Sequence, residues 1–159
     1  MLLVGGSAVS EAPWYFENFA AGQTFTSQGR TILDADIAGF AAWSWDTNPV
    51  HTDAELMASS RFGQRIAHGL LGMSVAMGLT SRIGVFETCS IALLGVEDWR
   101  FLAPVLVGDT LSCRVEILGA RLTSSGESGI LDRRFTLLNQ RNETVQTGRI
   151  GLLVAVSPR

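Results

Sequence analysis

The chain has 159 residues, 47% of them apolar and 17% charged, so it is long enough to bury a sizeable core and too apolar to be intrinsically disordered. Its formal net charge is −3, and its twelve basic residues are scattered arginines, which excludes a basic nucleic-acid-binding surface. Cys89 and Cys113 have no metal-ligand spacing and imply no disulfide framework, so we expect reduced thiols, with Cys113 buried, in a cytoplasmic protein.

The first twelve residues are expected to form a flexible tail, followed by a single domain over residues 13–159. The tail is apolar, but it lacks the basic residues that open a signal peptide. The longest apolar run, Gly69 to Leu79, is shorter than the ~20 residues that cross a bilayer. We therefore predict a buried helix there and no membrane segment.

In chain order, the first half of the sequence predicts one short strand and three helices. They are a strand at 23–27, a helix at 34–45 capped by Asp34, a short helix at 54–59 capped by Asp53, and a central helix at 69–83. The central helix is apolar nearly all round, a pattern that predicts burial on most of its sides.

From residue 90 onward the hydrophobic period changes to two, which is typical of strands. The clearest case is 110–117, where Leu111, Cys113, Val115 and Ile117 alternate with polar residues. The predicted strands are 91–102, 110–117, 129–139 and 143–156, separated by short turns. Long consecutive strands with short turns predict an antiparallel sheet, and a helix buried against it gives the α+β class.

The segment from Asp46 to His51 carries the first candidate chemistry. Pro49 forbids a continuous helix and pushes Asn48 toward extended geometry, so the chain must turn. A turn can bring the Asp46 carboxylate and the His51 imidazole to one spot, where they can hold a water molecule and move protons. An ordinary helix-ending turn is the alternative interpretation of the same residues.

Gly69 carries the second candidate. It begins the central helix, where backbone N–H groups have no intrahelical partner and can polarise a carbonyl oxygen. The alternative is a glycine needed only for tight packing. His68, which precedes it, is expected to be structural because it faces the start of a buried helix.

Three blocks of the sequence together resemble the MaoC-like dehydratases, the family that includes the (R)-specific enoyl-CoA hydratases (hydratase 2). The blocks are Ser44-Trp45-Asp46-Thr47-Asn48-Pro49-Val50-His51, then Arg65-Ile66-Ala67-His68-Gly69, and then Trp99 to Val105 followed by Gly108-Asp109-Thr110. Their order and spacing are more specific than any one block. The resemblance covers roughly Trp14 to Val156 and implies the hot-dog fold, a curled antiparallel sheet wrapped around one long helix.

The resemblance also implies an activity in fatty acid metabolism: reversible hydration of a trans-2-enoyl-CoA to an (R)-3-hydroxyacyl-CoA. The family's catalytic pair falls on Asp46 and His51, and its oxyanion-binding glycine on Gly69. Its motif asparagine falls on Asn48, which we place with Gly69 in the substrate-binding set or else regard as a turn residue only. No metal and no redox cofactor are implied. The family further implies a homodimer with its active sites at the interface.

One position departs from the family pattern. The family has glycine before the catalytic aspartate, and this chain has Trp45. If the position requires a positive φ, tryptophan is strained there. If the glycine leaves room for an acyl chain, Trp45 narrows the pocket. A third interpretation places Trp45 in the core with little effect.

Two other functions remain open at this point. A hot-dog acyl-CoA thioesterase would share the fold and the thioester ligand, and a non-catalytic acyl-CoA-binding subunit would keep the fold alone. The acyl group, the choice between coenzyme A and acyl carrier protein, and the assignment of Asp46 and His51 as base or acid are not determined. Arg65 and Arg100 either contact coenzyme A phosphates or are solvated surface residues.

Overall fold

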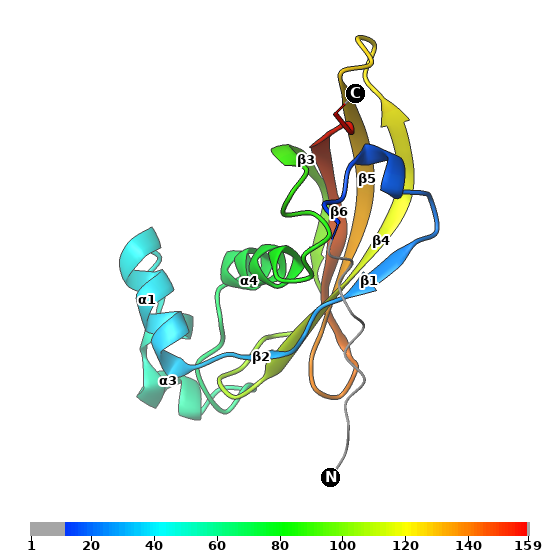
Figure 1. The fold of residues 1–159 in the computed structure, drawn as a ribbon. Coiled ribbons are helices and arrows are strands. Elements are labelled where there is room, and N and C mark those ends of the chain that lie inside the picture. Colours follow the sequence, from blue (N-terminus) through cyan, green and yellow to red (C-terminus); the bar gives the residue numbers. More distant parts are fainter. Residues whose placement is uncertain (1–11, 159) are drawn as a thin grey trace.

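The computed structural model describes residues 12–158, so the predicted tail lies outside the described residues except for Ala12. One antiparallel sheet and a few helices make up the domain (Figure 1). The elements are η1 (Phe16–Asn18), β1 (Thr24–Thr26), β2 (Arg30–Thr31), α1 (Asp34–Ser44), α2 (Pro49–Thr52), α3 (Ala54–Ala58), α4 (Gly69–Ser81), β3 (Ser90–Phe101), β4 (Thr110–Leu122), β5 (Ser128–Leu138) and β6 (Thr144–Ala155).

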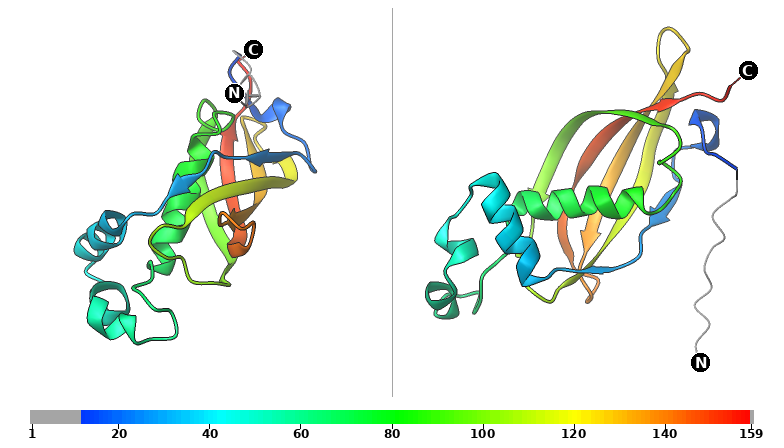
Figure 2. Two further views of the ribbon diagram at one scale, coloured as in Figure 1. Left: turned by 90° about the horizontal axis from the view of Figure 1, so that it is seen from below. Right: turned by 60° about the vertical axis from the view of Figure 1, so that its left-hand side comes forward.

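The six-stranded sheet is antiparallel, with strand order β1-β4-β5-β6-β3 and with β2 paired to β4. The sheet curls, and α4 lies across one of its faces (Figure 2). The short helices α1, α2 and α3 lie together beyond the N-terminal end of α4 (Figure 1). This arrangement confirms the predicted α+β class with a central helix on a curled sheet.

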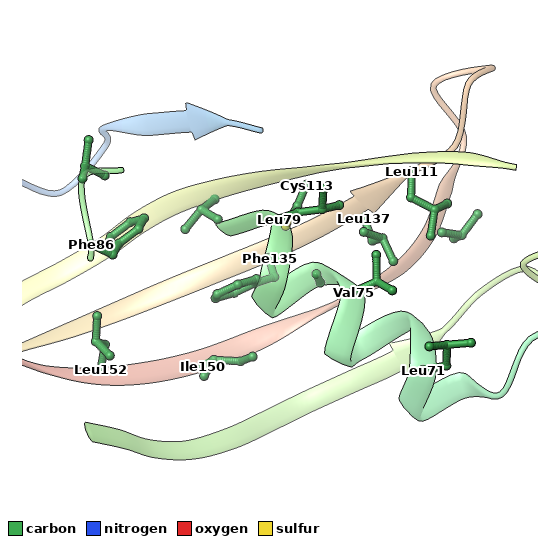
Figure 3. Packing of buried hydrophobic residues seen from close by; sticks show 14 of the residues in the cluster. Leu71, Val75, Leu79, Phe86, Leu111, Cys113, Phe135, Leu137, Ile150 and Leu152 are labelled. Carbon is green, nitrogen blue, oxygen red and sulfur yellow. The ribbon is translucent and has the colours of Figure 1, made fainter. Parts of the chain in front are cut away.

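The core lies between α4 and the sheet (Figure 3). Leu71, Val75 and Leu79 repeat on one side of the helix and are buried against inward-facing strand residues. Fully buried apolar strand residues include Leu111, Cys113, Val115 and Ile117 of β4, Leu131, Phe135 and Leu137 of β5, and Val145, Ile150 and Val154 of β6. The period-two pattern of the sequence therefore predicted the inward face of β4 correctly.

Both cysteines are free and buried, as predicted for Cys113. Burial raises the pKa of the Cys113 thiol to about 11. The side chain is therefore a neutral core residue at physiological pH.

The predicted cap of the first helix is wrong. Leu33 is the N-cap residue of α1, and its N–H donates to Asp36 Oδ2 at 2.8 Å, so Asp36 rather than Asp34 provides the cap. The side chain of Asp34, inside the first turn, pairs instead with Arg65. The prediction for α3 is confirmed, because Asp53 Oδ1 accepts a hydrogen bond from the Leu56 N–H at 2.9 Å.

Burial of the central helix on most of its sides is confirmed. The exposed residues of α4 form a single stripe, which consists of Leu70, Ser74, Gly78 and Ser81. Leu70, 59% exposed, is the one large apolar residue of this stripe.

Strand β3 forms one edge of the sheet and pairs with β6 alone. Every residue of β3 except Trp99 is exposed. Its large apolar side chains are exposed by 50–55%; they are Ile91, Leu93, Leu94, Val96 and Phe101. Within residues 12–158, no helix combines the length and apolar character that a membrane span needs.

Candidate active site

The bend after α1 is built from backbone bonds and a side-chain cap. Trp45 ends the helix in the left-handed conformation, with φ 63°. Asn48 is the N-cap of α2, where its Oδ1 accepts from the Val50 N–H at 3.2 Å, and Pro49 takes the first helical position. The predicted turn is therefore confirmed, and it reverses the chain between Asp46 and His51.

The reversal brings the two predicted catalytic side chains together. Asp46 Oδ2 lies 3.9 Å from His51 Nε2. This separation is too long for a direct hydrogen bond, but one water molecule can bridge the two atoms. The Asp46 side chain is 54% exposed and the His51 side chain 11%, so the pair faces solvent from the carboxylate side.

A carbonyl from another segment orients the His51 ring. His51 Nδ1 lies 2.8 Å from the carbonyl oxygen of Ile66, which can only accept a hydrogen bond. In the neutral ring the proton therefore sits on Nδ1. The Nε2 lone pair then faces Asp46 and is free to accept a proton.

The His68 side chain contacts both members of this pair. It is buried, with 3% exposure, and its Nε2 lies 2.9 Å from the backbone oxygen of Asp46. Its ring stacks on His51 with 3.7 Å between centroids and 26° between planes. These contacts agree with the structural role predicted for His68, since the ring holds both the Asp46 backbone and the His51 ring.

Gly69 is the first residue of α4, as predicted. Among the hydrogen bonds of the described chain, none gives its N–H a protein acceptor. A Cβ at this position would lie 2.8 Å from the Phe101 ring. The close approach of Phe101 therefore favours glycine here, which agrees with the packing interpretation. That the Gly69 N–H polarises a carbonyl oxygen of the substrate stays a prediction.

Gln146 is a site residue that sequence reasoning missed. Its Nε2 donates to Gly69 O at 3.1 Å, and its Oε1 accepts from Trp99 Nε1 at 3.2 Å. These bonds tie the start of α4 to β6 and β3. The sequence did contain a signal for it. Gln146 is a polar residue in the last predicted strand, and the period of two places it on the same inward face as Ile150 and Leu152.

A cavity of about 630 Å³ joins these groups. Asp46, His51, Gly69 and Gln146 line it together with apolar residues that include Trp43, Leu70 and Phe101. Trp45 and Asn48 are not among the lining residues. Asn48 caps the turn that carries His51, and its predicted place in the substrate-binding set stays a prediction.

Asp46, His51 and His68 also offer one metal-ligand atom each within 4.8 Å of one another. An imidazole binds a metal in the plane of its ring, and the two stacked rings cannot point at one ion unless one of them turns. The absence of a metal from the reaction stays a prediction.

Arg65 and Arg100, the two candidates for contacts with coenzyme A phosphates, have different surroundings. Arg65 Nη2 is hydrogen-bonded to Asp34 Oδ1 and therefore anchors the loop before α4 to α1. Arg100 is exposed on β3, next to the cavity residue Phe101.

A family model described as the MaoC-like domain matches residues 16–134, which is most of the chain. The chain belongs to the MaoC-like family. Membership confirms the resemblance inferred from the three sequence blocks.

Individual relatives agree with this membership. The chain is 40% identical over 101 residues to the protein MaoC of Klebsiella aerogenes, covering 64% of this chain and 30% of that protein. It is 34% identical over 105 residues to an (R)-specific enoyl-CoA hydratase of Rhodospirillum rubrum, covering 66% of this chain and 70% of the enzyme. The chain thus spans less than a third of the MaoC protein.

The fold is shared with a solved protein from Mycobacterium tuberculosis that is described as having a double hot-dog fold. The TM-score is 0.78 and the sequence identity 26%, over 92% of this chain and 45% of that one. The hot-dog fold expected from the sequence is therefore confirmed.

Proposed function

We propose that this MaoC-like domain reversibly hydrates a trans-2-enoyl-CoA to an (R)-3-hydroxyacyl-CoA. The observation that carries the proposal is the 3.9 Å approach of Asp46 Oδ2 to His51 Nε2. The pair lines a cavity that also contains the free N–H end of α4 at Gly69. The R stereochemistry and the coenzyme A thioester come from the activity named for the Rhodospirillum rubrum relative.

The two acceptors would orient one water molecule. Both the carboxylate of Asp46 and Nε2 of His51 accept hydrogen bonds, so the two water protons point at them and an oxygen lone pair is left for C3 of the substrate. One member of the pair removes a proton as the C3–O bond forms. The pair then returns a proton to C2, so that one water is added and no group is lost.

Negative charge develops on the thioester oxygen during this addition. The Gly69 N–H, aimed from the N-terminus of α4, would stabilise the enolate, and such a donor contributes about 3 kcal/mol in comparable sites. Gln146 fixes the donor indirectly, because it binds the carbonyl of the same residue. In this scheme Asp46 and His51 would carry out both proton transfers.

The test is the hydration rate with crotonyl-CoA and with longer and branched enoyl-CoAs. Asp46→Asn and His51→Ala should each lower kcat/KM by about 10²-fold or more. Asp53→Asn is the matched control, since that aspartate caps α3 and does not line the cavity. Near-parent rates in both site variants would refute the assignment, and release of free thiol without a change in enoyl absorbance would show thioester hydrolysis instead.

We also propose that the working form is a homodimer joined along β3. An edge strand with half-exposed apolar side chains is a template for pairing with a second chain. Phe101 at the end of β3 lines the cavity, so a second copy on this edge would lie beside the active site. Leu70 of α4, which is 59% exposed, could also be covered by this second copy.

A further inference from the structure

Arg133 is a charged residue in the hydrophobic core that the proposed reaction does not use. It lies on the inward face of β5 between the positions of Leu131 and Phe135, and its exposed fraction is 1%. The next residue, Arg134, points to the other face of the strand and pairs there with Glu116. The two neighbouring arginines thus have opposite surroundings.

The Arg133 guanidinium lacks a counter-ion. Nε donates to Ile150 O at 3.3 Å, and Nη2 has no hydrogen-bond partner. The rings of Phe86 and Phe135 lie 5.0 and 5.1 Å from the guanidinium carbon. No carboxylate of residues 12–158 forms a salt bridge with it. Such a group is costly to bury unless something pairs with it.

Burial lowers the pKa of Arg133 to about 10. The side chain therefore stays cationic at neutral pH and does not escape the burial cost by losing its proton. An anion that reached it would find an unused N–H donor in surroundings of low polarity.

A cavity of about 360 Å³ lies against the Arg133 side chain, which itself stays buried. Arg133 lines it together with the apolar side chains of Met77, Phe86, Leu93 and Leu152. Phe86 and Leu152 lie at the end of the core away from Leu71 (Figure 3). No lining residue is shared with the active-site cavity, which opens at the other end of α4.

The lining favours a carboxylate over a phosphate. The hydroxyl of Thr80 already donates to Ala76 O, and that of Ser90 to Phe86 O, so few donors remain besides the guanidinium. A planar carboxylate needs one guanidinium, whereas a phosphate needs donors on more sides. Glu87, the other charged residue of the lining, is exposed and opposes anions at the mouth.

We propose that this cavity binds a carboxylate carried on a short apolar chain, with Arg133 pairing with the carboxylate and the apolar lining holding the chain. Its volume is within the range of small-molecule sites. The carboxylate belongs to a free alkanoate, because the active-site cavity lies at the other end of α4 and shares no lining residue with this one.

The direct experiment is calorimetric titration of the full chain with hexanoate, with 1-hexanol as the uncharged control ligand. Hexanoate should bind, and Arg133→Met should weaken it by about tenfold or more. Arg134→Met, in the adjacent position on the opposite face, should leave the affinity unchanged. Arg133→Met should fold with an equal or higher Tm, because an unpaired buried charge has been removed. If it does not fold, Arg133→Lys replaces it and should weaken binding several-fold.

Two outcomes overturn the proposal. One is the absence of hexanoate binding by the parent protein, and the other is equal hexanoate affinity in the parent and in Arg133→Met. Neither measurement depends on the hydration rate, so the result stands apart from the hydratase function.

Discussion

Trp45 shows how a single residue can conflict with its place in the fold. The position requires the left-handed conformation, with φ 63°, and a residue with a Cβ is destabilised there by about 1–2 kcal/mol relative to its ordinary conformation. The side chain is 88% exposed and does not line the active-site cavity. Of the three interpretations made from the sequence, the structure supports backbone strain.

Replacement of Trp45 should therefore act on stability before it acts on substrate choice. Trp45→Gly should raise the free energy of unfolding by about 1 kcal/mol, measured by urea denaturation, because glycine adopts positive φ without a steric penalty. Trp45→Ala keeps the Cβ and should give little gain. The acyl chain-length profile should stay the same in Trp45→Gly and change in Trp43→Ala, since Trp43 lines the cavity. A profile altered by Trp45→Gly would support pocket shaping instead.

At the scale of elements, α4 has two faces with different demands on its glycines. On the buried face, a Cβ at Gly72 would lie 2.1 Å from Nε2 of Gln146, the atom that binds Gly69 O. On the exposed face, a Cβ at Gly78 would meet nothing within 4 Å. One glycine is needed for packing against β6, and the other only lowers the helix propensity.

Alanine at these two positions should give opposite results. Gly72→Ala should lower the free energy of unfolding by about 2 kcal/mol, because Gln146 is buried and hydrogen-bonded on both sides and cannot move freely. Gly78→Ala should raise it by about 0.5–1 kcal/mol. Both are measured by chemical denaturation, and the hydration rate should fall in the first variant only. If Gly72→Ala and Gly78→Ala had equal free energies of unfolding, the Gln146 side chain would not be packed against Gly72.

At the scale of the whole molecule, the edge strand β3 leaves an apolar surface open, and Leu70 of α4 is exposed as well. Exposed apolar patches of this kind mark interaction sites in soluble proteins. The active-site cavity lies next to both, since Leu70 and Phe101 are in its lining.

A charge on the β3 edge should therefore separate the proposed dimer. Val96→Lys should shift the protein to a monomer in light scattering after size-exclusion chromatography, because a lysine on an edge strand opposes pairing. Thr24→Lys places the same charge on β1, at the opposite edge, and should leave the mass unchanged. A monomeric parent protein, or a Val96→Lys variant that remains dimeric, would contradict the β3 interface.

The sequence by itself determined most of the elements and one local geometry. The alternation around Cys113 located β4, and the glycine-led apolar run located α4. Pro49 and Asn48 predicted the bend that brings Asp46 to His51, because both side chains belong to one short segment whose turn chemistry is local. The cap of α1 was misassigned by two residues, since Asp34 and Asp36 both stand near the helix start.

Only the tertiary structure decided what surrounds these groups. Ile66 orients the His51 ring, and Gln146 binds the start of α4, through contacts between segments that local periodicity does not relate. The tertiary structure also decided that one stripe of α4 is exposed and that Arg133 is buried without a counter-ion. Period and turn residues report local backbone preferences, whereas burial and charge pairing depend on which distant segments meet.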